Sequence, residues 1–193
     1  MPPLCAIVKS LIMENILEEF EESSVIYGTF WQRFQALFMD GLILSPAILF
    51  DWYNKTSLKS PWLLITIALL ATIYKPFMEY KYGSTLGKKM LNLRVVNKDF
   101  QNPSLLNILL RNVFDILERL ITLVIVLIVF SMPEFQQISL MKDFTNLQNS
   151  VVNNTLVIFI PLVLVIIEIV FLLTDKQKRA LHDWIGSTLV IKY

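Results

Sequence analysis

Four stretches of the chain are apolar over lengths that suit membrane helices, and polar segments separate them. Trp31 and Trp52 stand at the two ends of the first stretch, as aromatic anchors do at membrane interfaces. We therefore expect an all-α polytopic membrane protein with four transmembrane helices. The predicted spans cover about residues 30–50, 62–80, 111–132 and 155–174.

The third span needs residues from its polar neighbour. Its uninterrupted apolar run, residues 120–130, would form a helix only about 17 Å long, whereas the hydrocarbon core measures about 30 Å. The helix must therefore include part of 105–119, and Glu118 and Arg119 should enter the membrane. The rest of 105–119 either continues this span or lies along the interface as an amphipathic helix.

Two short segments alternate between apolar and polar residues, which is typical of β-strands. In the first, Leu91, Leu93 and Val95 alternate with polar side chains, and a turn signal follows at 97–99. The second segment spans 187–193. We expect the two to pair as a small cytosolic β element.

The composition supports a membrane protein. The chain is 55% hydrophobic and 17% charged, with a mean hydropathy of +0.58, whereas soluble domains are about 45–50% apolar and about 25% charged. A single cysteine, Cys5, excludes an intrachain disulfide, and a single histidine, His182, excludes a multi-histidine metal site. We expect no metal, no cofactor, no nucleic-acid partner and no enzymatic activity.

The distribution of lysine and arginine predicts the orientation. Seven of these residues lie between Lys75 and Arg111, and four follow residue 175, whereas the other two loops hold only three. Because basic loops stay in the cytosol, both termini and the middle loop should be cytosolic. Residues 1–26 would then form a cytosolic segment, in which either Met1 or Met13 is the start.

Charged residues inside the predicted spans are the candidate functional site. An aspartate at the centre of a membrane helix costs about 2.5–3.5 kcal/mol on insertion scales, so Asp40 must be compensated. Asp40, Glu118 and Glu168 fall at similar depth in the cytosolic half, about 10 Å in from the end of each span. The intramembrane polar site comprises Arg33, Asp40, Arg111, Asp115, Glu118, Arg119 and Glu168.

Within this set, spacing suggests two arrangements. Arg33 and Asp40 are seven residues apart and share a helix face, but their depths favour Arg33 as a cytosolic anchor rather than the direct partner of Asp40. Arg111, Asp115 and Arg119 follow at i, i+4 and i+8, so a continuous helix would place them in one stripe with ion pairs.

Two chemistries fit the clustered carboxylates. In a low dielectric they favour a shared proton or a bound monovalent cation, as in a transporter. They could equally form structural ion pairs that hold a small bundle together. Two other motifs are weak: Gly83–Lys89 is too short for a phosphate loop, and His182-Asp183 lacks a nucleophile, so it fits a structural helix-to-strand junction better.

The ordered motifs together resemble the RDD family of small bacterial membrane proteins, which is named for an arginine and two aspartates. The matching segments are Phe30-Trp-Gln-Arg33 with Asp40, Gly83-Ser-Thr-Leu-Gly87-Lys88 through Val96, Arg111, and Leu181-His-Asp183-Trp-Ile-Gly186. The resemblance covers about residues 27–193, implies an inner-membrane location, and assigns Arg33, Asp40 and Asp183 as the naming residues. It implies ion transport for some members and association with membrane assembly factors for others.

Two functions compete. The first, which the sequence favours, is transport of a cation, a proton or a small solute that uses Asp40 and Glu168, with a hydrated pocket reaching Asp40. Its counter-charges would be Arg33, Arg111 and Arg119. The second is a non-transporting scaffold or assembly factor, in which an arginine seals Asp40 and the segment 83–104 docks a partner. In either case we expect the chain to contact the lipid bilayer. Because the chain is small, we also expect it to bind a second copy or another membrane protein.

Overall fold

The computed structural model describes residues 25–152 and 155–193 and is mostly helical. The predicted N-terminal segment lies almost entirely outside the described residues, as do both candidate start positions. The elements in chain order are α2 (Phe30–Tyr53), η1 (Asn54–Leu58), α3 (Pro61–Tyr82), α4 (Leu86–Met90), β1 (Leu93–Asn97), α5 (Leu105–Arg111), α6 (Val113–Phe130), η2 (Pro133–Gln137), α7 (Met141–Val152), α8 (Thr155–Thr174), α9 (Leu181–Ile185) and β2 (Thr188–Lys192).

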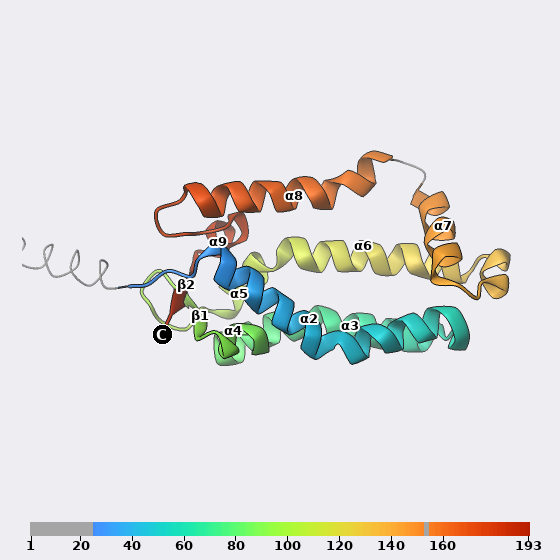
Figure 1. The fold of residues 1–193 in the computed structure, drawn as a ribbon, viewed down its shortest axis with the longest axis horizontal. Helices are drawn as coiled ribbons and strands as arrows, with labels where there is room; N and C mark the ends of the chain where they lie inside the picture. Colours follow the sequence, from blue (N-terminus) through green and yellow to red (C-terminus); the bar gives the residue numbers. More distant parts are fainter. Residues whose placement is uncertain (1–24, 153–154) are drawn as a thin grey trace, which may run out of the picture.

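Four long helices, α2, α3, α6 and α8, run along the long axis of the molecule (Figure 1). Local sequence signals set where the first two begin. The Thr29 side chain caps α2 in a capping box with Gln32, and Ser60 caps α3, whose first residue is Pro61. Within the described residues, the segment Phe30–Leu58 and helix α3 are long and apolar enough to cross a membrane.

The predicted two-stranded sheet is confirmed. β1 and β2 pair antiparallel, with Val95 opposite Val190, and Tyr27 adds a bridge to Ile191. Segments from before α2, between α3 and α6, and after α8 therefore meet in one place, which we call the sheet end. The opposite end, which we call the far end, holds η1, η2 and α7 (Figure 1).

Each end has its own small apolar core, and the middle of the molecule has little. The sheet-end core is Ala36, Leu93, Val95, Ile108 and Val190. The far-end core is Leu64, Val126, Val129, Phe135, Ile138 and Phe144. Between the two ends, apolar side chains such as Leu37, Leu70 and Ile121 point outward and are 69%, 65% and 56% exposed. An apolar exterior of this kind fits a lipid environment.

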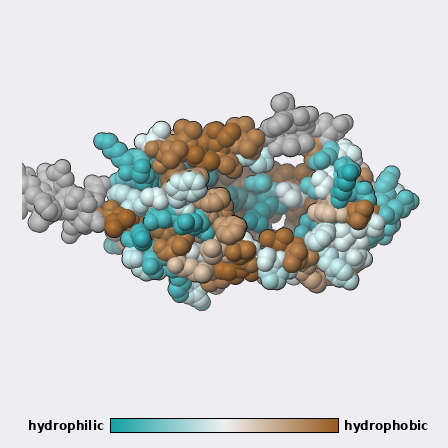
Figure 2. Space-filling view, in the orientation of Figure 1, coloured by the Kyte–Doolittle hydropathy of each residue, from teal (hydrophilic) through white to brown (hydrophobic). Residues whose placement is uncertain are grey.

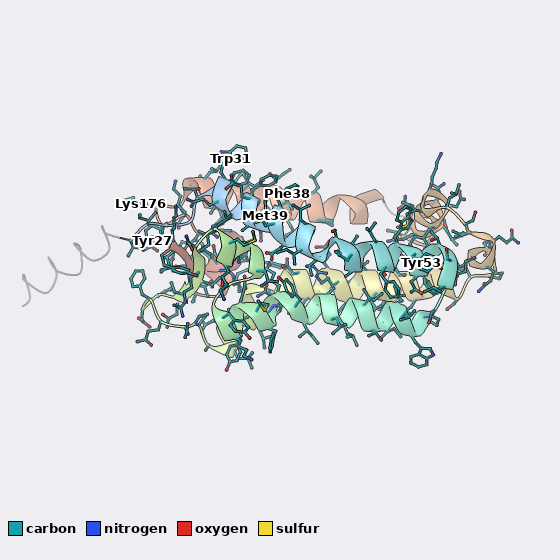
Figure 3. The ribbon with its side chains drawn as sticks, turned by 60° about the horizontal axis from the view of Figure 1, so that its bottom comes forward. Tyr27, Trp31, Phe38, Met39, Tyr53 and Lys176 are labelled. Atoms are coloured by element: carbon teal, nitrogen blue, oxygen red, sulfur yellow. The ribbon has the colours of Figure 1, made fainter. Side chains whose placement is uncertain are left out.

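The surfaces follow the same division. Figure 2 shows apolar surface along α8 and hydrophilic surface at the far end, around α7. Figure 3 labels Trp31 and Phe38 on α2, whose side chains are both largely exposed. Tyr27 and Lys176 lie at the sheet end and Tyr53 at the far end.

The predicted third span is divided by a break. Helix α5 ends at Arg111, Asn112 leaves helical geometry at φ −98° and ψ 10°, and α6 begins at Val113. Arg111 therefore lies on another helix than the rest of the expected stripe, whereas Asp115 and Arg119 remain together on α6. Arg111 is buried against α9, whereas Asp115 pairs with Lys75 of α3.

Gly87 allows α4 to approach α2 closely. A Cβ atom at this position would overlap the Ala36 carbonyl oxygen and lie 2.9 Å from the Asp40 nitrogen. Both are backbone atoms of a helix, so they have little freedom to move away. The contact between the two helices therefore requires glycine.

We predict that Gly87→Ala lowers the free energy of unfolding by about 2 kcal/mol or more, because α4 must separate from α2. Thermal melting in detergent micelles measures the loss. Gly41→Ala is the matched control, since a Cβ atom there meets nothing within 4 Å and alanine favours a helix by up to about 1 kcal/mol. Equal melting temperatures for the two variants would contradict the close packing.

Candidate functional site

Asp183 is the centre of a buried charge network at the sheet end. Its carboxylate is fully buried; Oδ2 lies 2.5 Å from Arg33 Nη1, and Oδ1 pairs with Arg111 Nη1. The backbone N–H of Ala180 also donates to Oδ2, at 3.0 Å, which caps α9. One side chain from α9 thus joins α2 and α5.

Arg33 is held by more than its ion pair. Its Nε donates to the Gly28 carbonyl at 3.1 Å, and its Nη2 donates to the Lys178 carbonyl at 2.5 Å. The guanidinium group thus connects the segment before α2 with the segment between α8 and α9. Arg33 pairs with Asp183 and does not pair with Asp40. The depths of Arg33 and Asp40 had predicted that these two residues are not direct partners.

A second buried carboxylate, Glu79, extends the network. It lies in the last turn of α3, is fully buried, and accepts from Lys88 Nζ at 2.5 Å and from Asn112 Nδ2 at 3.1 Å. Arg111 Nε lies 3.2 Å from its Oε2. Arg111 therefore lies between two carboxylates, Asp183 and Glu79, and joins them into one network.

Glu79 was absent from the sequence-based site. It stands at the end of an apolar segment beside tyrosines, where a charged side chain normally reaches water. Its burial depends on Lys88 and Asn112, which come from other elements. The spacing of residues along the chain carries no signal for this contact.

Asp40 has different partners from those of Asp183. Its Oδ2 accepts from Thr85 Oγ1 at 2.6 Å, and its Oδ1 accepts from the Gly87 N–H at 2.8 Å and from the Tyr74 hydroxyl at 3.0 Å. All three donors are uncharged, and they come from α3 and from the start of α4. The motif Gly83–Lys89, weak as a phosphate loop, provides two of the groups that hold Asp40.

None of the remaining predicted residues pairs with Asp40 in the described part of the chain. The Asp115 carboxylate pairs with Lys75, and Glu168 Oε1 lies 2.7 Å from His182 Nδ1. Glu118 and Arg119 are exposed, and neither takes part in an ion pair within the described part of the chain. Each carboxylate therefore has its own surroundings.

The pKa values of the ionisable groups at the sheet end follow from their burial and from the charges of their partners. Burial would raise the pKa of the Asp183 carboxyl, but the charges of Arg111 and Arg33 outweigh this effect and hold the pKa well below its usual range. Burial lowers the pKa of Lys88 to about 8, although Glu79 opposes the shift. Burial also lowers the pKa of His182, against the charge of Asp183, so the imidazole is neutral at pH 7.

A family model, that of the RDD family, matches residues 27–187. The chain belongs to the RDD family. No curated protein and no solved structure matches it. Of the three residues that the resemblance assigns as naming residues, Arg33 and Asp183 pair directly. The third, Asp40, lies on the same helix as Arg33 and binds α3 and α4 instead.

We predict that Asp183→Asn lowers the free energy of unfolding by about 3–5 kcal/mol, because it leaves Arg33 and Arg111 buried without a counter-charge. Thermal or denaturant unfolding in micelles measures the change. Asp51→Asn is the control, since Asp51 forms an i,i+4 pair with Lys55 and such pairs contribute about 0.3–0.5 kcal/mol. A loss for Asp183→Asn no larger than that of the control would contradict the network.

The low pKa of Asp183 also predicts a response to acid. The native pKa lies below the ordinary value of 3.8, so the stabilisation is complete above that value and decreases as the pH falls further. Melting temperatures between pH 7 and pH 3 should fall more steeply below about pH 4 for the wild type than for Asp183→Asn. Parallel curves would show that another group causes the acid response.

Proposed function

We propose that the protein is a bacterial inner-membrane protein with four spans, α2, α3, α6 and α8, and with both termini in the cytosol. The meeting of Tyr27, β1 and β2 at the sheet end supports an even number of crossings. The loop elements η1 and α7 pack together at the far end, which also fits four antiparallel passes (Figure 1). The sheet end holds the lysine-rich segments, which favours its cytosolic placement.

We further propose that the protein acts as a non-transporting scaffold or assembly factor of the membrane rather than as an enzyme. The observation that carries this proposal is the hydrogen bonding of Asp40. Both of its oxygens accept from groups that build the fold, namely the Tyr74 hydroxyl, the Thr85 hydroxyl and the Gly87 N–H. A carboxylate that binds a transported cation must release its donors in each cycle, and release here would detach α4 from α2.

The expected seal by an arginine does not occur, because the groups that close Asp40 are uncharged. Arg33 and Arg111 instead neutralise Asp183. Both arrangements nevertheless use the RDD charges to hold helices together. The cytosolic segment 83–104, with Met90 64% and Phe100 43% exposed, is the surface that we propose for a partner protein or a second copy.

Purified protein in liposomes tests the scaffold. We expect the flux of protons and of a panel of monovalent cations to equal that of protein-free liposomes, and Asp40→Asn to lower the melting temperature because three hydrogen bonds weaken. Asp51→Asn serves as the stability control. Cation-dependent flux in the wild type that Asp40→Asn abolishes would overturn the proposal.

Proton or cation transport is the second candidate, and the Glu168–His182 pair favours it. The Glu168 side chain is 34% exposed and that of His182 is 20% exposed, so both are accessible while they remain 2.7 Å apart. In the same liposomes, transport through this pair predicts proton flux that Glu168→Gln removes and Asp40→Asn leaves intact.

A further inference from the structure

A small pocket with a mostly apolar lining and a few polar groups lies between α3 and α6, apart from the contacts of Asp40 and Asp183. Its walls combine charged and amide groups with apolar ones, and it has room for about one molecule the size of water. The lining residues are Thr72, Lys75, Pro76, Asn112, Asp115, Ile116 and Arg119. Neither of the two functions considered above uses this pocket.

Asn112, one of the lining residues, carries an unsatisfied buried group. The residue is fully buried, and its Nδ2 donates to Glu79 Oε2 at 3.1 Å and to the Ile108 carbonyl at 2.9 Å. These two acceptors determine which end of the amide is nitrogen. The remaining atom, Oδ1, is a buried acceptor that no donor in the described part of the chain reaches. A buried acceptor without a donor is destabilising, so a donor is expected to bind it.

The charges of the pocket determine which donor fits. Lys75 and Arg119 are positive, Asp115 is negative, and Lys75 already pairs with Asp115. The resulting net positive charge disfavours a metal cation. The Asn112 Oδ1 and the Asp115 carboxylate disfavour an anion, since both are acceptors. Water can donate to Asn112 Oδ1 and to the Asp115 carboxylate, and it can accept from Arg119. It therefore matches both the acceptors and the donor of this pocket.

We propose that the pocket between α3 and α6 is a hydrated site at membrane depth, in which water donates to Asn112 Oδ1. The site goes beyond the scaffold function and rests on the proposed placement of α3 and α6 in the membrane. Its consequence is a short route from solvent to the buried network. Glu79 is separated from this water only by the amide of Asn112.

Cysteine accessibility tests the site, because methanethiosulfonate reagents react with thiolates and thiolates form in water rather than in lipid. The background is Cys5→Ser, which removes the single native cysteine. The first matched pair is Ile116→Cys, in the pocket wall, and Leu117→Cys, on the outer face of α6. Leu117 is 50% exposed and Ile116 is partly buried, so exposure alone predicts the opposite order from hydration.

With the small neutral reagent methyl methanethiosulfonate, which crosses membranes, we expect Ile116→Cys in membrane vesicles to react at least about tenfold faster than Leu117→Cys. Cysteine is smaller than isoleucine, so the substitution itself leaves room for the reagent in the pocket wall. A second pair on α3, Thr72→Cys in the wall and Ile73→Cys on the outer face, should show the same order. Ile73 is 56% exposed. Full labelling in denaturing detergent shows that each thiol is intact, and two pairs protect the test against one variant that fails to fold.

Lys98→Cys, in the turn after β1, gives the rate for a thiol in water. Equal and slow rates within both pairs overturn the hydrated pocket and leave the membrane placement intact. Equal rates as fast as that of Lys98→Cys overturn the pocket and the membrane placement together. A faster outer-face thiol in either pair also overturns the pocket.

Discussion

The ion pairs of Asp183 with Arg33 and Arg111 are the interaction on which the sheet end depends. A single buried carboxylate neutralises two guanidinium groups, and Arg111 then neutralises Glu79, which in turn holds Lys88. Each of these charges would be costly if buried alone, so the network is stable only as a whole. Because its members come from α2, α3, α4, α5 and α9, the network sets the mutual positions of those elements more firmly than the small sheet-end core could.

The fold could be predicted where the signal is local. The limits of α2 and α3 follow from Thr29 and Ser60, which cap apolar segments of membrane length, and the pairing of β1 with β2 follows from period-two alternation. The membership of the chain in the RDD family rests on short motifs around Arg33, Gly87 and Asp183, each of which is visible without a structure. The break at Asn112 was missed because the prediction followed the apolar pattern alone, although asparagine favours helix ends. Its side chain contacts Glu79 of α3, a partner that residue spacing does not reveal.

The site could be predicted only in part, because residue spacing does not report contacts across the chain. Arg33 and Asp40 share a helix, yet their partners lie on different elements, α9 for one and α3 and α4 for the other. Depth in the membrane placed Glu118 and Glu168 beside Asp40, but depth leaves the direction around each helix undetermined. Glu79 was missed for the same reason. Its position at a helix end is an ordinary one in the sequence, and only its contacts with Lys88 and Arg111 make it the second centre of the network.

The separation of Arg33 and Asp183 by 150 residues has a consequence for biosynthesis. Arg33 and Arg111 both leave the ribosome long before Asp183, so Asp183 cannot neutralise either guanidinium while the earlier helices are made. In the membrane placement proposed above, both charges would remain among headgroups or in water at the cytosolic surface and would anchor the early helices there. Asp183 would then draw these charges into the network, so that final packing follows insertion.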